Sequence, residues 1–492
     1  MLSALLLCIF WGVCAVIAWR TYSGKASAHP LPPVLSGGIP IIGHTHVISG
    51  NTKTIWDVLK SMSMESVRNG GLIYAHIGGK IYYLVTDPDD ALTVANTCLQ
   101  KHFIYNYLDN WLGNGLLTAS GAAWQRHRKL LNPAFTVSVI HNFLGIFNHM
   151  AKQFNSELAA HAGKEPFEIS HYLRLIAFQT FSRTAFGIGD ESVKEFARKY
   201  MESSDQLMNM VVYRFQNVWL HNDLIFRLTG LKKKEQKLIK TLDDMANQVI
   251  KRKKEELKHQ SKEPETGTRC KPLMSLLLEL KNDDTLTEKE IKEEVDTAIL
   301  AGFDTTSNTL TCMLVLIGSH PEVQRKMYEE MIDVLGPTRD VEKDDIKKLV
   351  YTEAVIKEAL RVLPIGPALM RNVDKDVKLR NYTMRAGSQC VILPVGTHHA
   401  PEWGDDVDVF RPERWLDPAI ATLGNGAFFG FSLGKRSCIG KTYAMISMKV
   451  TLSHFIRRYH ITADVSKMEL KVDMILKPTT AAVTIEERNL LN

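Results

Sequence analysis

Cys438 is the residue of this chain whose surroundings are best suited to chemistry. It lies in the segment "FSLGKRSCIG" (residues 431–440), directly before a run that fits a helix. Free backbone N–H groups at a helix start, and the positive end of the helix dipole, stabilise a thiolate. Three neighbours add positive charge: Lys435, Arg436 and Lys441. The sequence therefore predicts a stabilised thiolate at position 438.

The other cysteines offer Cys438 no partner. The seven cysteines stand at positions 8, 14, 98, 270, 312, 390 and 438, without a CxxC pair or a regular spacing. Neither a disulfide framework nor a structural zinc site is predicted from this pattern. Gly434 and Gly440 keep side chains away from the loop, so a flat, bulky group can approach its backbone. A lone thiolate facing a large planar ligand indicates haem iron.

The loop matches a known pattern. Five residues fill F-x-x-G-x-R-x-C-x-G, namely Phe431, Gly434, Arg436, Cys438 and Gly440. This pattern resembles the haem-binding loop of the cytochrome P-450 family, and the resemblance covers the chain from its N-terminal apolar stretch to about Val483. It implies a mainly α fold with a small β region, a triangular helical prism with haem between a long central helix and the cysteine loop.

A charge triad is expected behind this loop. Glu358 and Arg361 are similar to the family's E-x-x-R, and the i, i+3 spacing places both on one helix face. Arg414, in the "FRPERW" segment, can complete a buried triad. We assign these three residues to folding the haem pocket, with no part in the chemistry, because a buried pair that loses one partner is strongly destabilised.

Cations are also expected at the edge of the haem. Trp124 and Arg128 match the family's propionate-binding helix, and Arg436 and Arg371 resemble further propionate contacts. Arg128 can pair with one propionate while Trp124, one turn earlier, packs beside it. Together the three arginines would offset a dianionic ligand edge.

The segment "EVDTAILAGFDTTSNT" resembles the family's oxygen-activation groove. Gly302 is expected to loosen the helix, and Thr305 to offer a hydroxyl into the gap. By the resemblance, Asp304 supplies protons through water and Thr305 hydrogen-bonds the oxygen. The segment is similar to the fourth family, the animal branch with fatty-acid omega-hydroxylases, and especially to its insect members. Many members of that animal branch carry, just before the glycine, a glutamate that forms an ester with the haem. This chain has Ala301 at that position, so we expect non-covalent haem.

The resemblance also implies the walls of a lipophilic substrate pocket. The expected wall residues are Phe103, Ala301, Phe303, Ile365, Leu369 and Thr479, with Tyr105, Tyr107, Trp111 and Thr480 in the same segments. A further stretch, residues 210–230, contains Val211, Phe215, Trp219, Leu220 and Phe226. This stretch is either packed core or a membrane-dipping entrance, and we favour the entrance.

The elements that must position these residues are mostly helical. Thr287-x-x-Glu290 is a capping box that opens a helix running to Ser319, and Pro321 begins the next helix. A hairpin is expected at residues 72–85, short β-like pieces at 373–393, a solvated loop at 251–272 and a last long helix after Cys438. We interpret His398-His399 as structural rather than metal-binding, because adjacent strand residues point to opposite faces.

The N-terminus predicts a membrane anchor. Residues 1–19 contain no charged side chain, and a helix of that length spans roughly 28 Å. Arg20 and Lys25 follow the apolar run, which leaves the rest of the chain in the cytosol. The resemblance implies that the membrane is that of the endoplasmic reticulum. A cleaved signal peptide is the alternative. A Pro/Gly-rich linker at 20–43 then leads to the catalytic domain at 44–492.

The composition of the chain excludes other classes. The 492 residues are 45% apolar with a net charge of +6, which is ordinary for a globular protein and too mild for a nucleic-acid-coating one. No G-x-G-x-x-G follows a strand, so the sequence predicts no dinucleotide site of its own. The electrons that oxygen activation needs must therefore come from a partner protein. By resemblance this is a membrane-bound NADPH reductase that meets four cations: Arg126, Lys129, Lys435 and Lys441.

The sequence thus predicts a membrane-anchored haem-thiolate monooxygenase that inserts one atom of O2 into a lipophilic substrate, a fatty acid, hormone-like lipid or xenobiotic. Two alternatives keep the haem. One is an isomerase or dehydratase acting on peroxides, and the other is a non-enzymatic haem-binding protein. Intact Asp304 and Thr305 argue against both.

Overall fold

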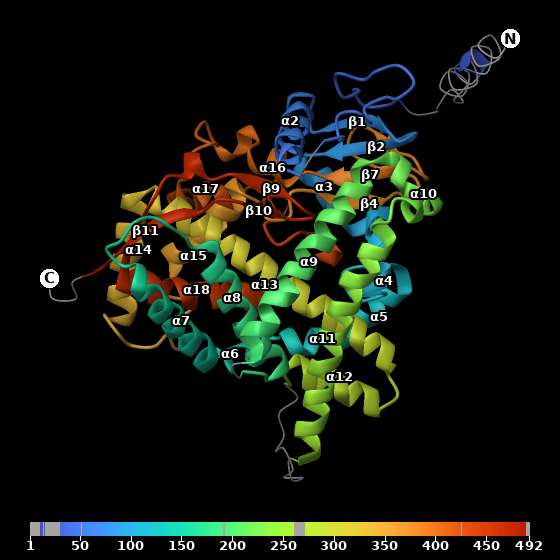
Figure 1. The fold of residues 1–492 in the computed structure, drawn as a ribbon. Coiled ribbons are helices and arrows are strands. Elements are labelled where there is room, and N and C mark those ends of the chain that lie inside the picture. The colour runs from blue at the N-terminus through green and yellow to red at the C-terminus, as the bar shows by residue number, and fades with distance from the viewer. Residues whose placement is uncertain are drawn as a thin grey trace.

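A computed structural model describes residues 10–12, 14, 30–50, 52–189, 192–259, 271–424 and 426–488. Helices make up most of the molecule, and a small sheet region lies at the end where the N-terminal residues are found (Figure 1). This arrangement confirms the mainly α fold with a small β region. The predicted anchor, residues 1–19, lies outside the described residues except for 10–12 and 14.

The main sheet has the strand order β1-β2-β7-β4. β1 (Leu72–Ile77) and β2 (Lys80–Val85) form the expected hairpin around Gly78 and Gly79, whose φ angles are +56° and +76°. β2 pairs in parallel with β7 (Gln389–Ile392), and β4 (Leu369–Asn372) is antiparallel to β7. The crossover between β2 and β7 therefore contains most of the helices.

The chain joins the folded body before residue 44. The amide of Tyr74 in β1 donates to the carbonyl of Pro33 at 2.9 Å, and the amide of His44 donates to the carbonyl of His76 at 2.6 Å. The second half of the Pro/Gly-rich segment therefore lies along the edge of the sheet.

The central helix is α13 (Glu288–Gly318). The Thr287 hydroxyl and the Glu290 carboxylate form the predicted capping box, and α14 (Pro321–Leu335) begins at the predicted proline. In the described part of the chain, α13 alone is long and apolar enough to cross a membrane. Because 83% of its apolar window is buried inside the protein, it is a core helix.

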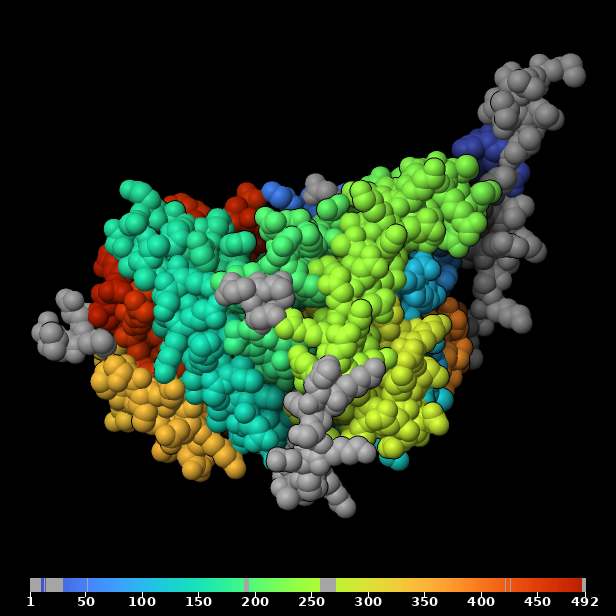
Figure 2. Space-filling view, turned by 60° about the horizontal axis from the view of Figure 1, so that its bottom comes forward, coloured from blue at the N-terminus to red at the C-terminus, as the bar shows by residue number. Residues whose placement is uncertain are grey.

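The other helices surround α13. They are α2 (Thr54–Arg68), α3 (Pro88–Thr97), α4 (Asp109–Leu112), α5 (Gly121–Leu131), α6 (Val137–His141), α7 (Leu144–Leu158), α8 (Ser170–Phe181), α9 (Ser192–Gln216), α10 (Asp223–Leu228), α11 (Leu231–His259), α12 (Leu273–Asn282), α15 (Val350–Val362), α16 (Pro394–His398), α17 (Pro418–Ala421) and α18 (Lys441–Arg458). Figure 2 shows the face on which segments from α7 to α12 cover the core.

The other strands form three small sheets. β11 (Ala482–Glu487) pairs with β3 (Phe167–Glu168) and β8 (Tyr459–Ala463), β9 (Leu470–Val472) with β10 (Leu476–Pro478), and β5 (Val377–Lys378) with β6 (Thr383–Met384). The β-like pieces predicted at 373–393 are confirmed by β5, β6 and β7.

The solvated loop predicted at 251–272 is wrong for residues 251–259, which are helical. α11 continues to His259, and residues 260–270 lie outside the described ranges. Lys251 pairs with Glu255 at 4.0 Å and Lys253 with Glu256 at 3.1 Å, and such i, i+4 and i, i+3 pairs help a charged sequence to remain helical.

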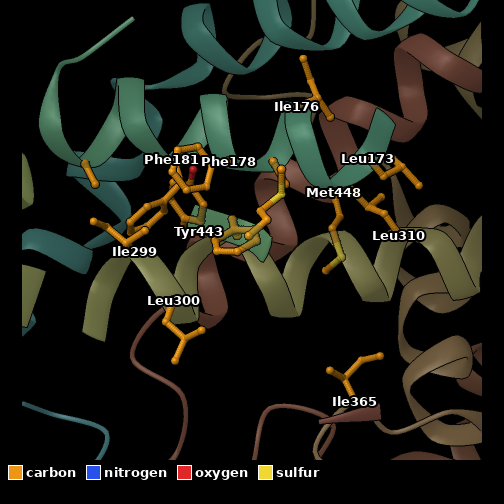
Figure 3. Close-up of a cluster of buried hydrophobic side chains, with 14 of the residues drawn as sticks. Leu173, Ile176, Phe178, Phe181, Ile299, Leu300, Leu310, Ile365, Tyr443 and Met448 are labelled. Atoms are coloured by element: carbon orange, nitrogen blue, oxygen red, sulfur yellow. The ribbon is translucent and has the colours of Figure 1, made fainter. Parts of the chain in front are cut away.

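The core packs α8 against α13 and α18. Leu173 and Phe178 of α8 meet Leu310 of α13 and Tyr443 and Met448 of α18 in one buried cluster (Figure 3). Leu300 and Ile365 lie on the opposite side of α13 in this view. One side of α13 therefore packs against α8 and α18, and the side with Leu300 points away from α8.

Candidate active site

Cys438 lies on the loop before α18. A 3-10 turn at Gly434–Arg436 precedes it, and α18 begins at Lys441, so the cysteine is two residues ahead of the helix N-cap, Gly440. The Cys438 amide donates to the carbonyl of Phe431 at 2.9 Å, which closes the loop on itself. The predicted position next to a helix start is therefore confirmed.

The two loop glycines, Gly434 and Gly440, were expected to let a flat ligand approach the backbone, and their surroundings differ from each other. At Gly434 the φ angle is +65°, and an added Cβ would lie 2.9 Å from the backbone of Ala95 in α3. Gly434 is thus required for the loop to pack on α3, not to admit a ligand. At Gly440 an added Cβ would meet the Cys438 Sγ at an ordinary 3.8 Å.

The thiol environment has opposing effects. Cys438 is solvent-accessible, yet protein atoms surround its sulfur, and this burial raises the pKa of the thiol. The Gly440 N–H and Lys441 lower the pKa, as expected from the sequence, and Arg128 also lowers it, but burial outweighs them, so the predicted stabilisation of the free thiolate is wrong. A coordinating metal cation deprotonates a thiol outright, so this site suits a thiolate that is bound to metal.

A cluster of cations lies near the loop. Arg128 donates to the carbonyl of Ser437 at 2.7 Å, and the Arg436 guanidinium lies 4.4 Å from the ring centroid of Trp124. Burial, and then the charge of Arg371, lower the pKa of Arg436 to about 9. The structure therefore brings together Trp124, Arg128 and Arg436, and it places Arg371 within electrostatic reach of Arg436.

Lys101 is a member of this cluster that the sequence did not reveal. Its ammonium lies 4.2 Å from the ring centroid of Tyr105. Burial lowers its pKa well below the ordinary value, and Arg371 and Arg436 lower it further. A single lysine outside any motif gives no signal in the sequence; its backbone bridge to Arg371 becomes visible only in the folded chain.

These cations fit an anionic group. The Nε atoms of Arg371 and Arg436 are buried and have no hydrogen-bond partner among the described residues. In that part of the chain, none of Lys101, Arg128, Arg371 and Arg436 has a carboxylate within ion-pair distance. Because unpaired buried cations are costly, the cluster suits a ligand edge with two negative charges, such as the propionates of haem.

The predicted charge triad is present behind the loop. Glu358, Arg361 and Arg414 have side chains with 0% exposure. Glu358 Oε1 lies 2.9 Å from Arg361 Nη2 and 2.9 Å from Arg414 Nε. Arg414 also contacts Asp406 at 3.0 Å. These groups bind one another rather than a ligand, as a structural role requires.

Ala301 and Thr305 share one face of α13. Ala301 is exposed although the helix is mostly buried, and the Thr305 hydroxyl donates to the Ala301 carbonyl at 2.8 Å. The expectation that Gly302 loosens the helix is wrong, because α13 is unbroken from Glu288 to Gly318. An added Cβ at Gly302 would lie 2.3 Å from the Phe181 ring, so this glycine permits the close approach of α8.

Asp304 lies in a buried ion network rather than beside Thr305. Its Oδ2 is 2.7 Å from Lys477 Nζ, and its Oδ1 is 3.7 Å from Arg174 Nη2. Neighbouring helix residues point about 100° apart, so the two side chains leave α13 in different directions. Asn308, one turn later on α13, donates to Asp304 Oδ1 at 3.2 Å, whereas the charged partners come from α8 and β10, and no local spacing in the sequence predicted them.

The predicted pocket walls are only partly brought together. Ala301 is exposed, Leu369 and Phe103 are half-buried, and Ile365 is 5% exposed. Thr479 is exposed and its hydroxyl contacts the Glu469 carbonyl at 3.3 Å. Phe303 is wrong as a wall residue, because it is fully buried, with its ring centroid 5.2 Å from that of Phe178 and 6.1 Å from that of Tyr200.

The histidine pair is helical rather than in a strand. His398 ends α16, its Nε2 accepts the Phe429 amide at 3.1 Å, and His399 Nδ1 bonds the Val395 carbonyl at 2.9 Å. The two rings therefore bind backbone groups.

A groove of about 570 Å³ opens away from the cysteine loop. Aromatic side chains form much of its wall, and four cations with one carboxylate complete it. The lining includes Tyr82, Phe103, Tyr107, Phe215, Phe226, Lys80, Arg214, Arg227, Lys232 and Asp223. No residue of the 431–440 loop lines the groove, so it is not the site of the thiolate.

The 210–230 stretch contains both core and surface. Val211, Leu220 and Phe226 are at most 3% exposed and belong to the core, whereas Trp219 is 61% exposed. Leu224 and Leu228 are also exposed, at 65% and 79%. The packed-core interpretation is therefore confirmed for Val211, Leu220 and Phe226, and the membrane-dipping entrance stays a prediction for the exposed residues.

The cations expected to meet a reductase differ in availability. Lys129, Lys435 and Lys441 are exposed and have no ion-pair partner among the described residues. Arg126 is already paired with Glu290 at 2.5 Å. The exposed positive charge around the cysteine loop therefore comes from the three lysines.

Comparison with known proteins agrees with the resemblance seen in the sequence. The family model described as "Cytochrome P450" matches residues 32–485. The chain is 30% identical to cytochrome P450 4V2 of Mus musculus over 464 residues, 91% of this chain and 87% of the relative. It is 32% identical to cytochrome P450 4c21 of Blattella germanica (85% and 86%) and 31% identical to cytochrome P450 4d2 of Drosophila melanogaster (90% and 90%).

Proposed function

The chain belongs to the cytochrome P450 family and is a haem-thiolate monooxygenase, and we propose that it works at a membrane on an acidic, lipophilic substrate. The observation that carries the haem assignment is the position of Cys438 beside a cluster of buried cations without carboxylate partners among the described residues. The thiolate suits the haem iron, and the cationic cluster suits the haem propionates.

The chain's own residues have separate tasks. Cys438 would hold the iron, and Arg128, Arg371 and Arg436 would hold the propionates, with Trp124 stacked on Arg436. Bound haem supplies an iron centre at which O2 is activated for transfer of one oxygen atom. The Thr305 hydroxyl, held at the Ala301 carbonyl, is the group on the open face of α13 that can pass a proton.

Exposed apolar side chains support contact with a membrane. Trp219, Leu224 and Leu228 are exposed, as are Ile39 and Ile41 at 45% and 56%. The α10 region and residues 30–50 lie at the same end of the molecule (Figures 1 and 2), and Gln216 Nε2 donates to the Ile48 carbonyl at 3.2 Å. An apolar patch next to the predicted anchor suits insertion into a lipid surface.

The groove supports an acidic lipid as substrate. It contains Phe103, one of the expected pocket walls, and it lies between the exposed apolar residues and the sheet. Lys80 and Arg227 line it, and neither has an ion-pair partner among the described residues. Arg214 and Asp223, by contrast, bind each other. An alkyl chain with a terminal carboxylate matches both the aromatic walls and the two cations.

The electrons are proposed to come from an NADPH-dependent reductase. The exposed lysines 129, 435 and 441 provide a positive surface close to Cys438. An acidic face on the reductase would be steered toward them, and added salt would weaken the encounter.

The test of the haem site is a carbon monoxide difference spectrum of reduced membranes. Wild type should give a strongly red-shifted Soret band that Cys438→Ser lacks. Cys312→Ser, which changes a buried cysteine on α13, should keep the band. A band that survives in Cys438→Ser would refute the assignment of the thiolate.

The test of the substrate class compares dodecanoic acid with 1-dodecanol, using purified reductase and NADPH. Lys80→Met should raise the KM for the acid about two- to fivefold and leave that for the alcohol unchanged. Equal effects on both compounds would refute the carboxylate contact. Product formed from a hydroperoxide without NADPH would instead favour an isomerase or dehydratase.

A further inference from the structure

Lys477 is the point where three carboxylates from three elements meet. Its Nζ lies 2.7 Å from Asp304 on α13, 3.1 Å from Asp205 on α9 and 3.3 Å from Asp473, four residues earlier. Lys477 is 5% exposed, and Asp304 and Asp473 are 6% and 0% exposed. Within the described chain no other lysine bridges three acids.

Two further cations complete this network. Arg174 of α8 holds Asp205 with two bonds, of 2.8 and 2.9 Å, and reaches Asp304 at 3.7 Å. Lys471 of β9 lies 3.4 Å from Asp473. Three acids thus face three cations, and Lys477 is the cation closest to Asp304. Tyr200, whose buried hydroxyl has no partner among the described residues, lies within electrostatic reach of Asp304.

The strand that holds Lys477 also contacts the predicted substrate pocket. The amide of Leu476 donates to the carbonyl of Ile365 at 2.8 Å, and Thr479 directly follows β10. Successive strand residues point to opposite faces, so Leu476 and Lys477 leave β10 on opposite sides. A three-residue strand therefore joins a pocket wall to the acid on α13.

The tip of the β9–β10 hairpin has a strained conformation. Met474 has a φ of +77°, which a side chain other than glycine rarely adopts, and both oxygens of Asp473 lack a hydrogen-bond partner among the described residues. Burial raises the pKa of Asp473 to about 6, while Lys477 acts in the opposite direction. The turn between β9 and β10 therefore combines a strained residue, Met474, with a buried carboxylate, Asp473, that lies near Lys471 and Lys477.

We propose that Lys477 is a positioning residue that fixes the Asp304 carboxylate to the β9–β10 hairpin. Substrate that contacts the hairpin would then change the position of the Asp304 carboxylate. This inference rests on the proposed monooxygenase function, with the proton role predicted for Asp304 and with Ile365 and Thr479 as predicted pocket walls. A purely structural network would stabilise the fold without linking the pocket to Asp304.

The test uses the haem-loaded protein and four variants. Lys477→Met removes the charge at similar length, and Lys477→Arg restores it. Lys449→Met is the matched control, because Lys449 is 3% exposed and pairs with Glu353 at 2.8 Å on a different element. Should Lys477→Met fail to incorporate haem, the variant Lys477→Gln/Asp473→Asn removes one charge of each sign and serves in its place.

The first measurement is hydrogen–deuterium exchange of residues 301–309, with and without 1-dodecylimidazole as the pocket probe. We expect the probe to change exchange in this segment in wild type, Lys477→Arg and Lys449→Met. In Lys477→Met the change should fall at least about fivefold, at unchanged probe affinity. An equal probe effect in Lys477→Met and wild type would overturn the proposal.

The second measurement is product formed per NADPH consumed, with dodecanoic acid and purified reductase. Lys477→Met should lower this ratio at least about fivefold at a similar KM, and Lys477→Arg should recover more than half of it. A lowered ratio that Lys477→Arg does not recover would overturn the positioning role. If wild type forms no product at all, the proposed function fails, and the exchange experiment still decides the link between hairpin and α13.

Discussion

Glu358 is the residue whose replacement should reveal most about what holds the haem pocket together. Its carboxylate accepts five hydrogen bonds, from Arg361 Nε and Nη2, Arg414 Nε, the Arg411 amide and Trp415 Nε1. All of them are between 2.9 and 3.0 Å long, and the side chain has no exposure. Glu358→Gln keeps the shape but removes the charge and turns one acceptor into a donor.

The expected loss of stability follows from the burial of both arginines. Arg361 and Arg414 would keep only carbonyl groups and the partly exposed Asp406 as partners. Removing one partner of a buried ion pair costs about 3–5 kcal/mol. A domain is stable by only about 5–15 kcal/mol, so the variant should unfold at a much lower urea concentration and lose haem during purification.

The assay is urea unfolding followed by tryptophan fluorescence, together with the haem content of each purified protein. The chain offers a matched control in Glu322→Gln, because Glu322 and Arg325 have the same i, i+3 spacing but side chains that are 63% and 52% exposed. An exposed pair contributes about 0.2–1 kcal/mol, so the control should stay close to wild type. A Glu358→Gln protein within about 1 kcal/mol of wild type, with full haem, would refute this reasoning.

Three further predictions test other parts of the structure. Gly302→Ala should lower stability by about 1–3 kcal/mol, because its Cβ would meet the Phe181 ring, and Gly302→Ala/Phe181→Leu should recover part of the loss in a thermal melt; no effect of the single change would show that α8 can move aside. Asp473→Asn should stabilise the protein at pH 7.5 but not at pH 4. The pKa of Asp473 is about 6 in the folded chain against 3.8 in the unfolded chain, so the folded chain retains this proton between the two values. The free energy of unfolding of the wild type therefore falls by about 3 kcal/mol as pH rises through that window. Melting curves at both pH values check this, and a variant less stable than wild type at pH 7.5 would contradict it. Charge reversal at Lys129 or Lys435 should slow reduction by the reductase at least about threefold at low salt and have no effect at high salt, as measured by stopped-flow absorbance; a salt-independent loss would point to another cause.

The sequence by itself determined the parts of the protein that depend on neighbours along the chain. The cysteine loop, the Glu358–Arg361 spacing, the Thr287 capping box and the hairpin at Gly78-Gly79 each involve residues within a few positions of one another. Local geometry fixes such contacts, since a helix turn or a two-residue turn brings the same side chains together in any fold. The family resemblance then supplied the order in which these local pieces occur.

Only the tertiary structure decided which side of α13 each residue faces and which distant charges meet. Ala301 is exposed while Phe303, two positions later and so about 200° around the helix, is in the core, and the direction of the core was set by α8 and α9. Gly302 admits the Phe181 ring, and Lys477 reaches Asp304 from a strand 173 residues away in the sequence. Contacts of this kind arise when burial brings remote segments together, because desolvated charges must find partners wherever packing places them.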